Sequence, residues 1–336
     1  MKSSRFRRRA GWSLVGLSLL LHILTVYAFS RQPEFLAAYT VMPIWVWGGI
    51  GLLLSIVAFW FLRAPLSLIL TGIWAITVLL GADEARVIAN LGKSAPEPGQ
   101  AGVADGKFLV RVLTLNCKHF NYAPNSDPSL DIQRWDPDIV LLQEVEPIQV
   151  KRVADRLYQG HGDYRTFMSN GIVTRWRISR EVRNQLYRDQ QVTVMKQPEG
   201  AAIEVVNVHL EKASTDLRLW NPDCWYNHRV NRKVRAVELW HTLQVLADTA
   251  SGRPAIVGGD FNAPPSDPIQ SLMKGNFDDA FVQAGTGWGD TYQRRIPILR
   301  IDQIHSTRQL RPIRCSAVTT RHSDHRMVVA DFLMVP

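Results

Sequence analysis

The chain has 336 residues, of which 46% are hydrophobic and 21% are charged, and its formal net charge is +9. This length fits one large domain together with a further segment. The three cysteines, Cys117, Cys224 and Cys315, are too few for the disulfide framework of a small secreted module, and they leave room for one bridge at most. Residues 103–336 hold 30 Lys/Arg and 26 Asp/Glu, a mild excess that suits a polyanionic partner without requiring one.

Three stretches without a charged residue dominate the N-terminal region, at 11–30, 41–62 and 64–82. Each has about the ~20 residues that cross the hydrocarbon core of a bilayer. The basic residues before the first stretch would also fit a cleaved signal peptide, but a signal peptide does not explain the two stretches that follow. We therefore predict a membrane anchor over residues 1–91 with three transmembrane helices and the lipid bilayer as its partner. No protein partner is evident.

The basic residues set the expected orientation of these spans. Five of them precede the first span and Arg63 lies between the second and the third, whereas Asp83 and Glu84 follow the third. Because Lys and Arg are retained on the cytoplasmic side, three spans place residues 83–336 outside the cytoplasm. We predict a multi-pass protein of the inner (plasma) membrane whose large domain is periplasmic or extracellular. Without the third span, that domain would be cytoplasmic.

The composition and residue pattern of the chain change twice after the apolar region. Residues 92–107 are rich in Gly, Pro and Ala without an apolar period, which is typical of a linker. Residues 108–336 then form the large domain. Strands are expected at 108–115, 138–142, 164–168, 171–176, 192–196, 201–208, 299–306, 312–319 and 326–335, and helices at 127–136, 147–159 and 229–248. The strands outnumber the helices and do not alternate strictly with them, which favours an α/β or α+β sandwich. The longest helix carries Val230, Val234, Val237 and Leu243 on one apolar stripe.

Residues 254–267 (PAIVGGDFNAPPSD) form the central motif of this domain. An apolar run closed by two glycines predicts a buried strand whose end opens into a loop. Asp260 and Asn262 are two residues apart, so on extended backbone both point to the same side and Phe261 points to the core. A carboxylate beside a carboxamide can orient a water and hold a phosphate oxygen. The alternative is a common Asp/Asn turn.

Other expected strands also end in a polar residue that can bind a metal or move a proton. These residues are Asn116, Glu144, His209, Asp302, Asp324 and His325. Strand ends are the usual place to build a rigid site. An oxygen-rich set without cysteine suits Mg²⁺ or Mn²⁺ rather than structural zinc. Phosphoester hydrolysis needs such an ion, a base for water and an acid for the leaving oxygen.

At this point the chain resembles the endonuclease/exonuclease/phosphatase superfamily, which includes deoxyribonuclease I. The matching stretches are VLTLNCKHF, DIVLLQEVE, SNGIVTRWRI, IEVVNVHLEK, IVGGDFNAPPSDP, RIDQIHS and HSDHRMVVADF, in the family's order over about residues 108–333. The resemblance implies a four-layer α/β sandwich, with two facing mixed β-sheets flanked by helices and the site at one edge. It makes residues 108–336 the catalytic domain.

The resemblance implies a metal site. Glu144 resembles the principal ligand, Asn116 lies near the same metal, and Asp324 resembles a second acidic ligand or its support. The implied cofactor is Mg²⁺ or Mn²⁺. The chain departs from many members at Lys118, where they carry an acidic residue, and this weakens any second ligand there.

The resemblance also implies the catalytic groups. Asp260 and Asn262 resemble the pair that positions the attacking water and a phosphate oxygen. His325 resembles the catalytic histidine, and Asp302 the carboxylate that fixes its tautomer. His209 resembles the second histidine, which some members use at the departing oxygen. The general base stays open: His325 backed by Asp302 has an intrinsic pKa of about 6.5, whereas Asp260 would need a raised pKa.

Together these inferences predict a membrane-tethered, divalent-metal-dependent phosphoester hydrolase of phosphodiesterase or nuclease type. The substrate is a nucleic acid or a lipid head group, so a lipid head-group phosphodiesterase or phosphatase is the alternative. A catalytically silent binding domain is disfavoured because the site residues are all retained. The insert at 217–228 carries Trp220, Trp225 and Tyr226, which form either a cluster packed on the long helix or a loop that contacts substrate or membrane.

Overall fold

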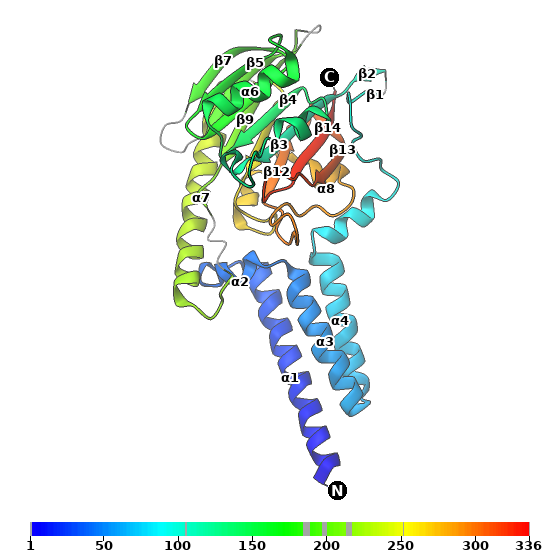
Figure 1. Ribbon diagram of the computed structural model, residues 1–336. Coiled ribbons are helices and arrows are strands. Elements are labelled where there is room, and N and C mark those ends of the chain that lie inside the picture. The colour runs from blue at the N-terminus through cyan, green and yellow to red at the C-terminus, as the bar shows by residue number, and fades with distance from the viewer. Residues whose placement is uncertain are drawn as a thin grey trace. The chain divides into compact units, whose positions relative to one another are not determined.

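The computed structural model describes residues 2–104, 106–183, 189–196, 200–212, 217–250 and 252–335 (Figure 1). The chain divides into two compact units. Unit 1 comprises Met1–Ala89, Asp216–Arg229 and Ser266–Pro268, and unit 2 comprises Asn90–Thr215, Val230–Pro265 and Ile269–Pro336. Two short pieces of the C-terminal part therefore pack with the N-terminal helices.

Unit 1 is built on apolar helices. Its helical segments are α1 (Lys2–Arg31), η1 (Glu34–Leu36), α2 (Ala37–Val41), α3 (Ile44–Leu62) and α4 (Pro65–Gly81), followed by η2 (Glu84–Asn90). Two of them are long and apolar enough to cross a membrane, over Arg5–Arg31 and Ile44–Leu62. The helix at the third expected span has only 17 residues, about 26 Å at 1.5 Å per residue. The expected number of three spans is therefore not confirmed.

The helices of unit 1 pack through a small apolar core of Val15, Ala58, Leu70 and Trp74 and through hydrogen bonds between their side chains. Trp74 Nε1 donates to Ser18 Oγ over 3.0 Å, and Ser18 Oγ donates to the carbonyl of Gly51. His22 Nε2 lies 2.9 Å from Thr77 Oγ1. The exposed residues are instead large and apolar: Leu17, Leu20, Ile23, Leu53, Trp60, Leu68, Ile69, Ile76 and Leu80. A water-soluble bundle shows the opposite distribution.

Unit 2 begins at Asn90, and the segment expected as a linker packs on it. Arg111 is fully buried, and its guanidinium donates to the carbonyls of Glu97 and Gly99 as well as to the Asp331 carboxylate. Ala101 packs in a small core with Leu109 and Leu333. Strands β1 (Val103–Ala104) and β2 (Lys107–Phe108) pair beside it. Only eight residues, 82–89, separate α4 from this unit.

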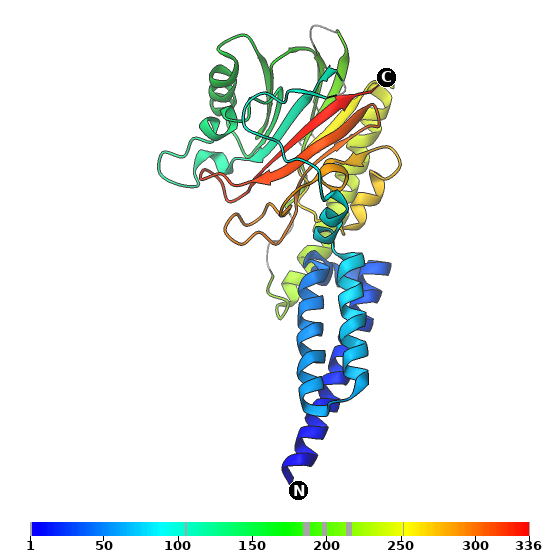
Figure 2. The same ribbon diagram turned by 90° about the vertical axis from the view of Figure 1, so that its right-hand side faces the viewer.

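Two mixed six-stranded sheets form the body of unit 2, which confirms the predicted sandwich. The first sheet has the order β13 (Leu310–Val318), β14 (Met327–Met334), β3 (Val110–Asn116), β4 (Ile139–Gln143), β6 (Asn170–Thr174) and β5 (Asp163–Phe167). The second has the order β11 (Asp278–Asp279), β12 (Asp302–Ser306), β10 (Ala255–Asp260), β9 (Ala202–His209), β8 (Gln190–Met195) and β7 (Arg177–Arg183). Figure 2 shows β13 and β14 side by side in orange and red.

Within each sheet, one neighbouring pair is parallel: β3 with β4, and β9 with β10. The carboxyl ends of these four strands are therefore at matching edges. Asn207 joins the two sheets, because its side chain donates to the carbonyls of Leu142 and Gly171 and accepts from Gln143. This cross-sheet contact fixes the edges that carry the candidate residues.

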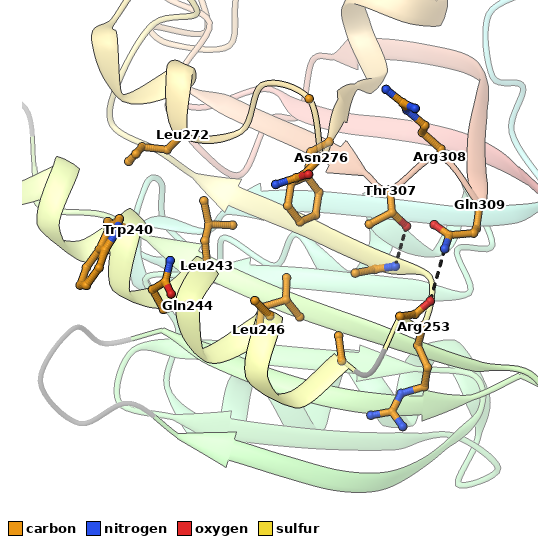
Figure 3. Close-up of a pocket in the computed structure, with 16 residues that line it drawn as sticks. Trp240, Leu243, Gln244, Leu246, Arg253, Leu272, Asn276, Thr307, Arg308 and Gln309 are labelled. Atoms are coloured by element: carbon orange, nitrogen blue, oxygen red, sulfur yellow. Dashed lines mark hydrogen bonds between the residues drawn. The ribbon is translucent and has the colours of Figure 1, made fainter.

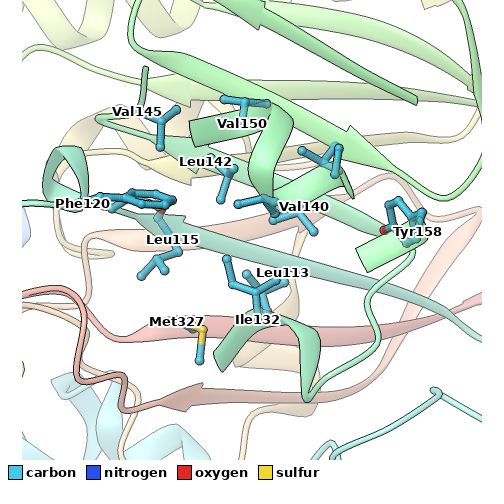
Figure 4. Packing of buried hydrophobic residues seen from close by; sticks show 14 of the residues in the cluster. Leu113, Leu115, Phe120, Ile132, Val140, Leu142, Val145, Val150, Tyr158 and Met327 are labelled. Carbon is cyan, nitrogen blue, oxygen red and sulfur yellow. The ribbon is translucent and has the colours of Figure 1, made fainter. Parts of the chain in front are cut away.

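Helices cover both outer faces of the sandwich. The first sheet packs on α5 (Ser129–Gln133) and α6 (Pro147–Tyr158), where Leu113, Leu115, Val140, Leu142 and Val150 are buried completely (Figure 4). The second packs on α7 (Pro222–Ala250), where Leu239 and Leu246 meet Val206, Val208 and Val257. The remaining short helices are η3 (Lys118–Phe120), η4 (Pro268–Leu272) and α8 (Ala280–Ala284).

Two local expectations differ from the structure. On α7, Val230, Val234 and Val237 of the apolar stripe are exposed, and only Leu243 packs against the core. The residues of α7 that face inward include Arg235, which is fully buried. The edge strand β7 was not expected, because its sequence RISREVR is mostly polar and its side chains are largely accessible.

Candidate active site

Four of the predicted site residues lie at one edge of the sandwich, at the carboxyl ends of the parallel strands. Asn116 ends β3 opposite Gln143, and Glu144 follows directly on β4. His209 ends β9 in register with Asp260, which ends β10. Asp260 also pairs with Asp302, the first residue of β12. The polar residues collect here because a parallel pair brings its carboxyl ends together.

Side-chain contacts join the two sheets at this edge. Asn116 Nδ2 lies 3.2 Å from Glu144 Oε1 and 3.1 Å from Asp260 Oδ2. His209 Nε2 lies 3.9 Å from Glu144 Oε1 and 4.0 Å from Asp260 Oδ2. Asn116 and Asp260 are almost completely buried, whereas Glu144 and His209 keep about a fifth of their side chains accessible. Glu144 and His209 thus form the accessible part of this group.

His325 and Asp302 form a buried pair next to Asp260. His325 Nδ1 lies 2.8 Å from Asp302 Oδ2, and the other oxygen of Asp302 is buried without a hydrogen-bond partner among the described residues. Ligand-type atoms of Asp260, Asp302 and His325 all lie within 4.8 Å of one another. The pair occupies one ring nitrogen of His325 and leaves Nε2 for another partner.

The turn after β10 differs in detail from the extended backbone that we expected. Asp260 Oδ1 accepts from the backbone N–H of Asn262, whose φ is +48°. The Asn262 side chain donates to the carbonyl of Leu210, so its own carbonyl oxygen is the group left for a ligand. Phe261 is buried in the core, as its position in the motif predicts. At Gly259, φ is +139° and a Cβ would lie 2.0 Å from the Val208 carbonyl oxygen, so only glycine fits.

The electrostatics separate the acidic groups into two kinds. Burial raises the pKa of Asp260, and the neighbouring Asp302 carboxylate raises it further. Burial also acts to raise the pKa of Glu144, but the hydrogen bond from Asn116 and the nearby His209 and Lys118 outweigh it, and the pKa is lowered. Burial acts to lower the pKa of His325, yet the Asp302 carboxylate dominates and raises that pKa to about 9. Of Glu144 and Asp260, Glu144 is therefore the one whose surroundings favour the ionised form.

Residues 113–325 match the Endonuclease/Exonuclease/phosphatase family, a span that includes all the residues described above. The chain belongs to this family. A comparison with curated proteins finds no match. Family membership makes phosphoester hydrolysis the general chemistry expected of unit 2, which contains the matched residues.

Solved structures share the fold of this family member at low sequence identity. The endonuclease/exonuclease/phosphatase from Bacteroides vulgatus is 18% identical with a TM-score of 0.55, and the match covers 68% of this chain and 100% of that one. A mannosyl-6-phosphatase from Bacteroides thetaiotaomicron is 16% identical with a TM-score of 0.55, covering 67% and 100%. A humanized TDP2 of D. rerio is 16% identical with a TM-score of 0.53, covering 67% and 99%.

Asp324, the third expected metal ligand of this family member, is turned toward Lys118. Lys118 Nζ lies 3.3 Å from Asp324 Oδ2, and the other Asp324 oxygen is buried without a hydrogen-bond partner among the described residues. Burial acts to lower the pKa of Lys118, but the Asp324 carboxylate raises it on balance. Lys118 thus places a cation at the edge of the site, where we expected no ligand.

Several residues at this edge of the candidate site have left-handed backbone conformations. Lys118, His119 and Phe120 have φ of +51°, +53° and +54°, and Glu144 has φ of +49°. Such values are unfavourable for non-glycine residues and persist only where the surroundings hold them. Here the His119 N–H donates to the Glu144 carbonyl over 2.7 Å, and Phe120 packs in the first core. With this backbone conformation, Lys118 and Glu144 lie close enough for their charges to interact.

Sequence reasoning missed two residues that support the family site. Ser323 Oγ donates to the Asn116 carbonyl over 2.6 Å and accepts from the His325 N–H, so it joins β3 to the histidine segment. The Tyr292 ring lies 5.0 Å from the His325 ring. Ser323 stands in the HSDH motif and could have been inferred, whereas nothing around Tyr292 marks it. Asn170 begins β6 in register with Gln143 and is buried.

The residues present fit a divalent cation. The donors are carboxylates, one carboxamide and imidazoles, a set that suits Mg²⁺ or Mn²⁺. Buried carboxylate oxygens of Asp302 and Asp324 without partners indicate missing positive charge.

A cavity of about 680 Å³ lies elsewhere, between α7, the segment after η4 and the β12–β13 turn, and no site residue lines it (Figure 3).

Proposed function

We propose that the chain is a membrane-tethered, divalent-metal-dependent phosphoester hydrolase. The observation that carries the proposal is the buried Asp302–His325 pair beside Asp260, at the same edge as Glu144 and Asn116. This edge holds the His325–Asp302 pair, which can transfer a proton, together with the Asp260 carboxyl group and the ionised Glu144 carboxylate. Family membership supports phosphoester hydrolysis as the reaction class, and these residues would bind the metal and transfer the protons.

In the proposal the metal site uses Glu144 and Asn116, with Asp324 as a further ligand or support. A bound Mg²⁺ or Mn²⁺ would offset negative charge on the phosphoryl oxygens. Asn116 Oδ1 accepts the Lys118 N–H and keeps a second lone pair that could serve the ion, while Asn116 Nδ2 donates to Glu144 and Asp260. Lys118 would contribute a second positive charge next to Asp324.

The proton-transfer groups follow from their environments. Asp260, whose pKa is raised, accepts a proton from the attacking water, and Asn262 holds that water and a phosphoryl oxygen. His325, protonated at neutral pH beside Asp302, stabilises the negative charge of the reacting phosphate. His209, on the accessible side, donates to the departing oxygen. Intrinsic pKa values alone would instead favour His325, at about 6.5, over Asp260 as the general base.

The membrane tether is supported by unit 1. Its outward faces carry large apolar side chains, and hydrogen bonds between the helices satisfy polar side chains inside, an arrangement that suits lipid surroundings. With three spans, the basic N-terminus would place unit 2 in the periplasm or outside the cell. There it would meet lipid head groups and extracellular nucleic acids.

The proposed activity is tested on the full chain in detergent micelles with bis(p-nitrophenyl) phosphate. We expect hydrolysis with Mg²⁺ or Mn²⁺, loss with EDTA, and loss in Glu144→Gln and His325→Gln. A folded, metal-supplemented chain that cleaves neither this ester, nor DNA, nor phospholipid would refute the proposal and leave a binding domain as the function. For an active chain, a steep loss of DNA cleavage with rising salt would mark a nucleic-acid substrate, because counterion release dominates such binding.

A further inference from the structure

Residues 217–229, which we call the interfacial segment, belong to unit 1 together with the apolar helices. Trp225 of this segment packs against a buried cluster of Ala28, Leu36 and Tyr39. That cluster lies where α1 ends and α3 begins. The interfacial segment is thus part of the same folded body as the ends of the helices that would cross the membrane.

Aromatic residues are concentrated at this end of the helices. The Tyr39 and Trp47 rings stack with centroids 3.9 Å apart, and Trp47 Nε1 donates to the Tyr39 carbonyl. Phe29 packs on the same cluster. Trp45 Nε1 donates to Glu84, just beyond α4, so the end of α4 is at the same level. Trp and Tyr gather at the boundary between hydrocarbon and water, where an apolar ring and a polar tip are both satisfied.

The interfacial segment is held in one conformation with its largest side chains uncovered. Trp225 Nε1 donates to the Leu219 carbonyl over 2.8 Å, and the Asn221 N–H donates to the Arg218 carbonyl. Trp220 is nevertheless 82% exposed and Tyr226 62% exposed. Ordering a loop so that it presents an indole to water gains nothing from hydrophobic burial. The two exposed rings are therefore available to an apolar partner.

Lipid is the occupant that the surroundings favour. The exposed cations Arg218 and Arg229 flank the two rings, and lipid head groups carry phosphates that attract them. The rings project from the folded body that contains the helix ends, so the nearest apolar phase is the bilayer itself. A protein partner would need a surface for which unit 1 gives no separate evidence.

We propose that the interfacial segment inserts Trp220 and Tyr226 into the head-group region of the leaflet reached by the C-terminal end of α1. The inference rests on the proposed membrane tether and extends it: the chain runs from the interfacial segment into unit 2 at Val230, so the unit that carries the candidate site is tied to the lipid surface at a second point. The substrate class that this arrangement favours is a phosphoester held in the membrane, with its phosphate at head-group level.

The proposal is tested with the full chain in phosphatidylcholine nanodiscs. Trp220→Cys is labelled with the environment-sensitive fluorophore NBD, since Cys117, Cys224 and Cys315 are buried. Leu130→Cys, labelled in the same way, is the matched control, because Leu130 is an exposed apolar residue of α5 in unit 2. Nanodiscs carry either 5-doxyl or 12-doxyl phosphatidylcholine as quenchers. We expect a blue-shifted Trp220→Cys emission, quenched more by the shallow 5-doxyl lipid, and a water-like, unquenched control.

Three outcomes would overturn the insertion. A water-like, unquenched probe at position 220 means that the segment does not reach lipid. A blue-shifted probe that neither doxyl lipid quenches means that protein covers it. Equal quenching at positions 220 and 130 means that the contact is not specific to the interfacial segment. Co-purification of the chain with the nanodisc reports separately on the tether, and cleavage of soluble bis(p-nitrophenyl) phosphate reports separately on the catalytic activity.

Activity provides a second readout. In the double variant Trp220→Ser/Tyr226→Ser, we expect unchanged hydrolysis of soluble bis(p-nitrophenyl) phosphate. Hydrolysis of a phospholipid in phosphatidylcholine vesicles should fall, because the site meets the surface less often. Equal rates of the variant and the unmodified chain on the vesicle substrate would contradict a role in substrate supply.

Discussion

His325 Nδ1 lies 2.8 Å from Asp302 Oδ2, and both side chains are almost completely buried. The carboxylate therefore stabilises the protonated imidazole, although burial alone would favour the neutral ring. The two residues lie 23 positions apart: Asp302 begins β12, and His325 lies in the segment that precedes β14.

Replacing Asp302 tests this pair. In Asp302→Asn we expect the pKa of His325, measured by NMR, to fall from about 9. The rate constant for phosphodiester hydrolysis should fall about 10²-fold or more, the usual worth of an acid–base group. The surface variant Asp155→Asn, which removes a pairing partner of Lys151, should leave both quantities unchanged. A full rate in Asp302→Asn would show that the pair does not take part in the reaction.

Replacing Glu144 tests the proposed metal site. Glu144→Gln keeps the shape of the side chain and removes the ionised oxygen that we assign to the metal. Titration calorimetry with Mn²⁺ should show affinity weakened at least about tenfold. Thermal unfolding in EDTA serves as the folding control. Unchanged Mn²⁺ affinity in the folded variant would transfer the site to the Asp260, Asp302 and His325 group.

Lys118 offers a test of the cation beside Asp324. Lys118→Asn removes the charge but keeps a residue that tolerates left-handed backbone. The Lys118–Asp324 pair is partly exposed, so the free energy of unfolding should change by less than about 1 kcal/mol. We expect KM for an anionic phosphodiester to rise, with a smaller change in kcat. Lys118→Arg should restore KM, and a KM that is the same in all three proteins would exclude a contact with the phosphate.

The Asp279–Arg300 ion pair makes stability depend on pH. Burial acts to raise the pKa of Asp279, but Arg300 outweighs it and the pKa falls from 3.8 to about 2. A carboxyl group with a lowered pKa in the folded state stabilises it fully above the unfolded value of 3.8, and this contribution is lost as the pH falls through 2. We expect Asp279→Asn to lower the free energy of unfolding by about 2 kcal/mol at pH 7, measured by urea denaturation. The difference should vanish near pH 2, and a difference independent of pH would contradict the ion-pair origin.

The orientation of the chain decides which substrates it meets. Alkaline phosphatase fused after Pro336 should be active in a bacterial host, and green fluorescent protein at the same place should be dark, because the basic residues keep the N-terminus in the cytoplasm. The opposite pattern would place the catalytic unit in the cytoplasm and show that α4, with 17 residues, does not span. Fusions after Arg63 serve as the control, since that turn should be cytoplasmic in either case.

Local sequence pattern determined the elements that carry the chemistry. The run from Ala255 to Asp260, with its two glycines, specifies a buried strand and its exit, because apolar burial and left-handed backbone are properties of adjacent residues. The same holds for β3, β4 and β9, which end at Asn116, next to Glu144 and at His209. Resemblance to the family then supplied the two-sheet arrangement and the roles of these residues.

Tertiary structure alone decided the contacts between them and the properties that depend on burial. The raised pKa of Asp260 comes from burial and from Asp302 on the neighbouring strand, and the raised pKa of His325 comes mainly from Asp302, 23 residues away, so no local pattern encodes them. The stripe on α7 faced outward because buried partners, not helical periodicity, decide which side packs. Likewise, residues 92–107 have the composition of a linker, but the carbonyls of Glu97 and Gly99 within them accept hydrogen bonds from the buried Arg111. Composition and periodicity report on neighbours along the chain, whereas desolvation and pairing depend on neighbours in space.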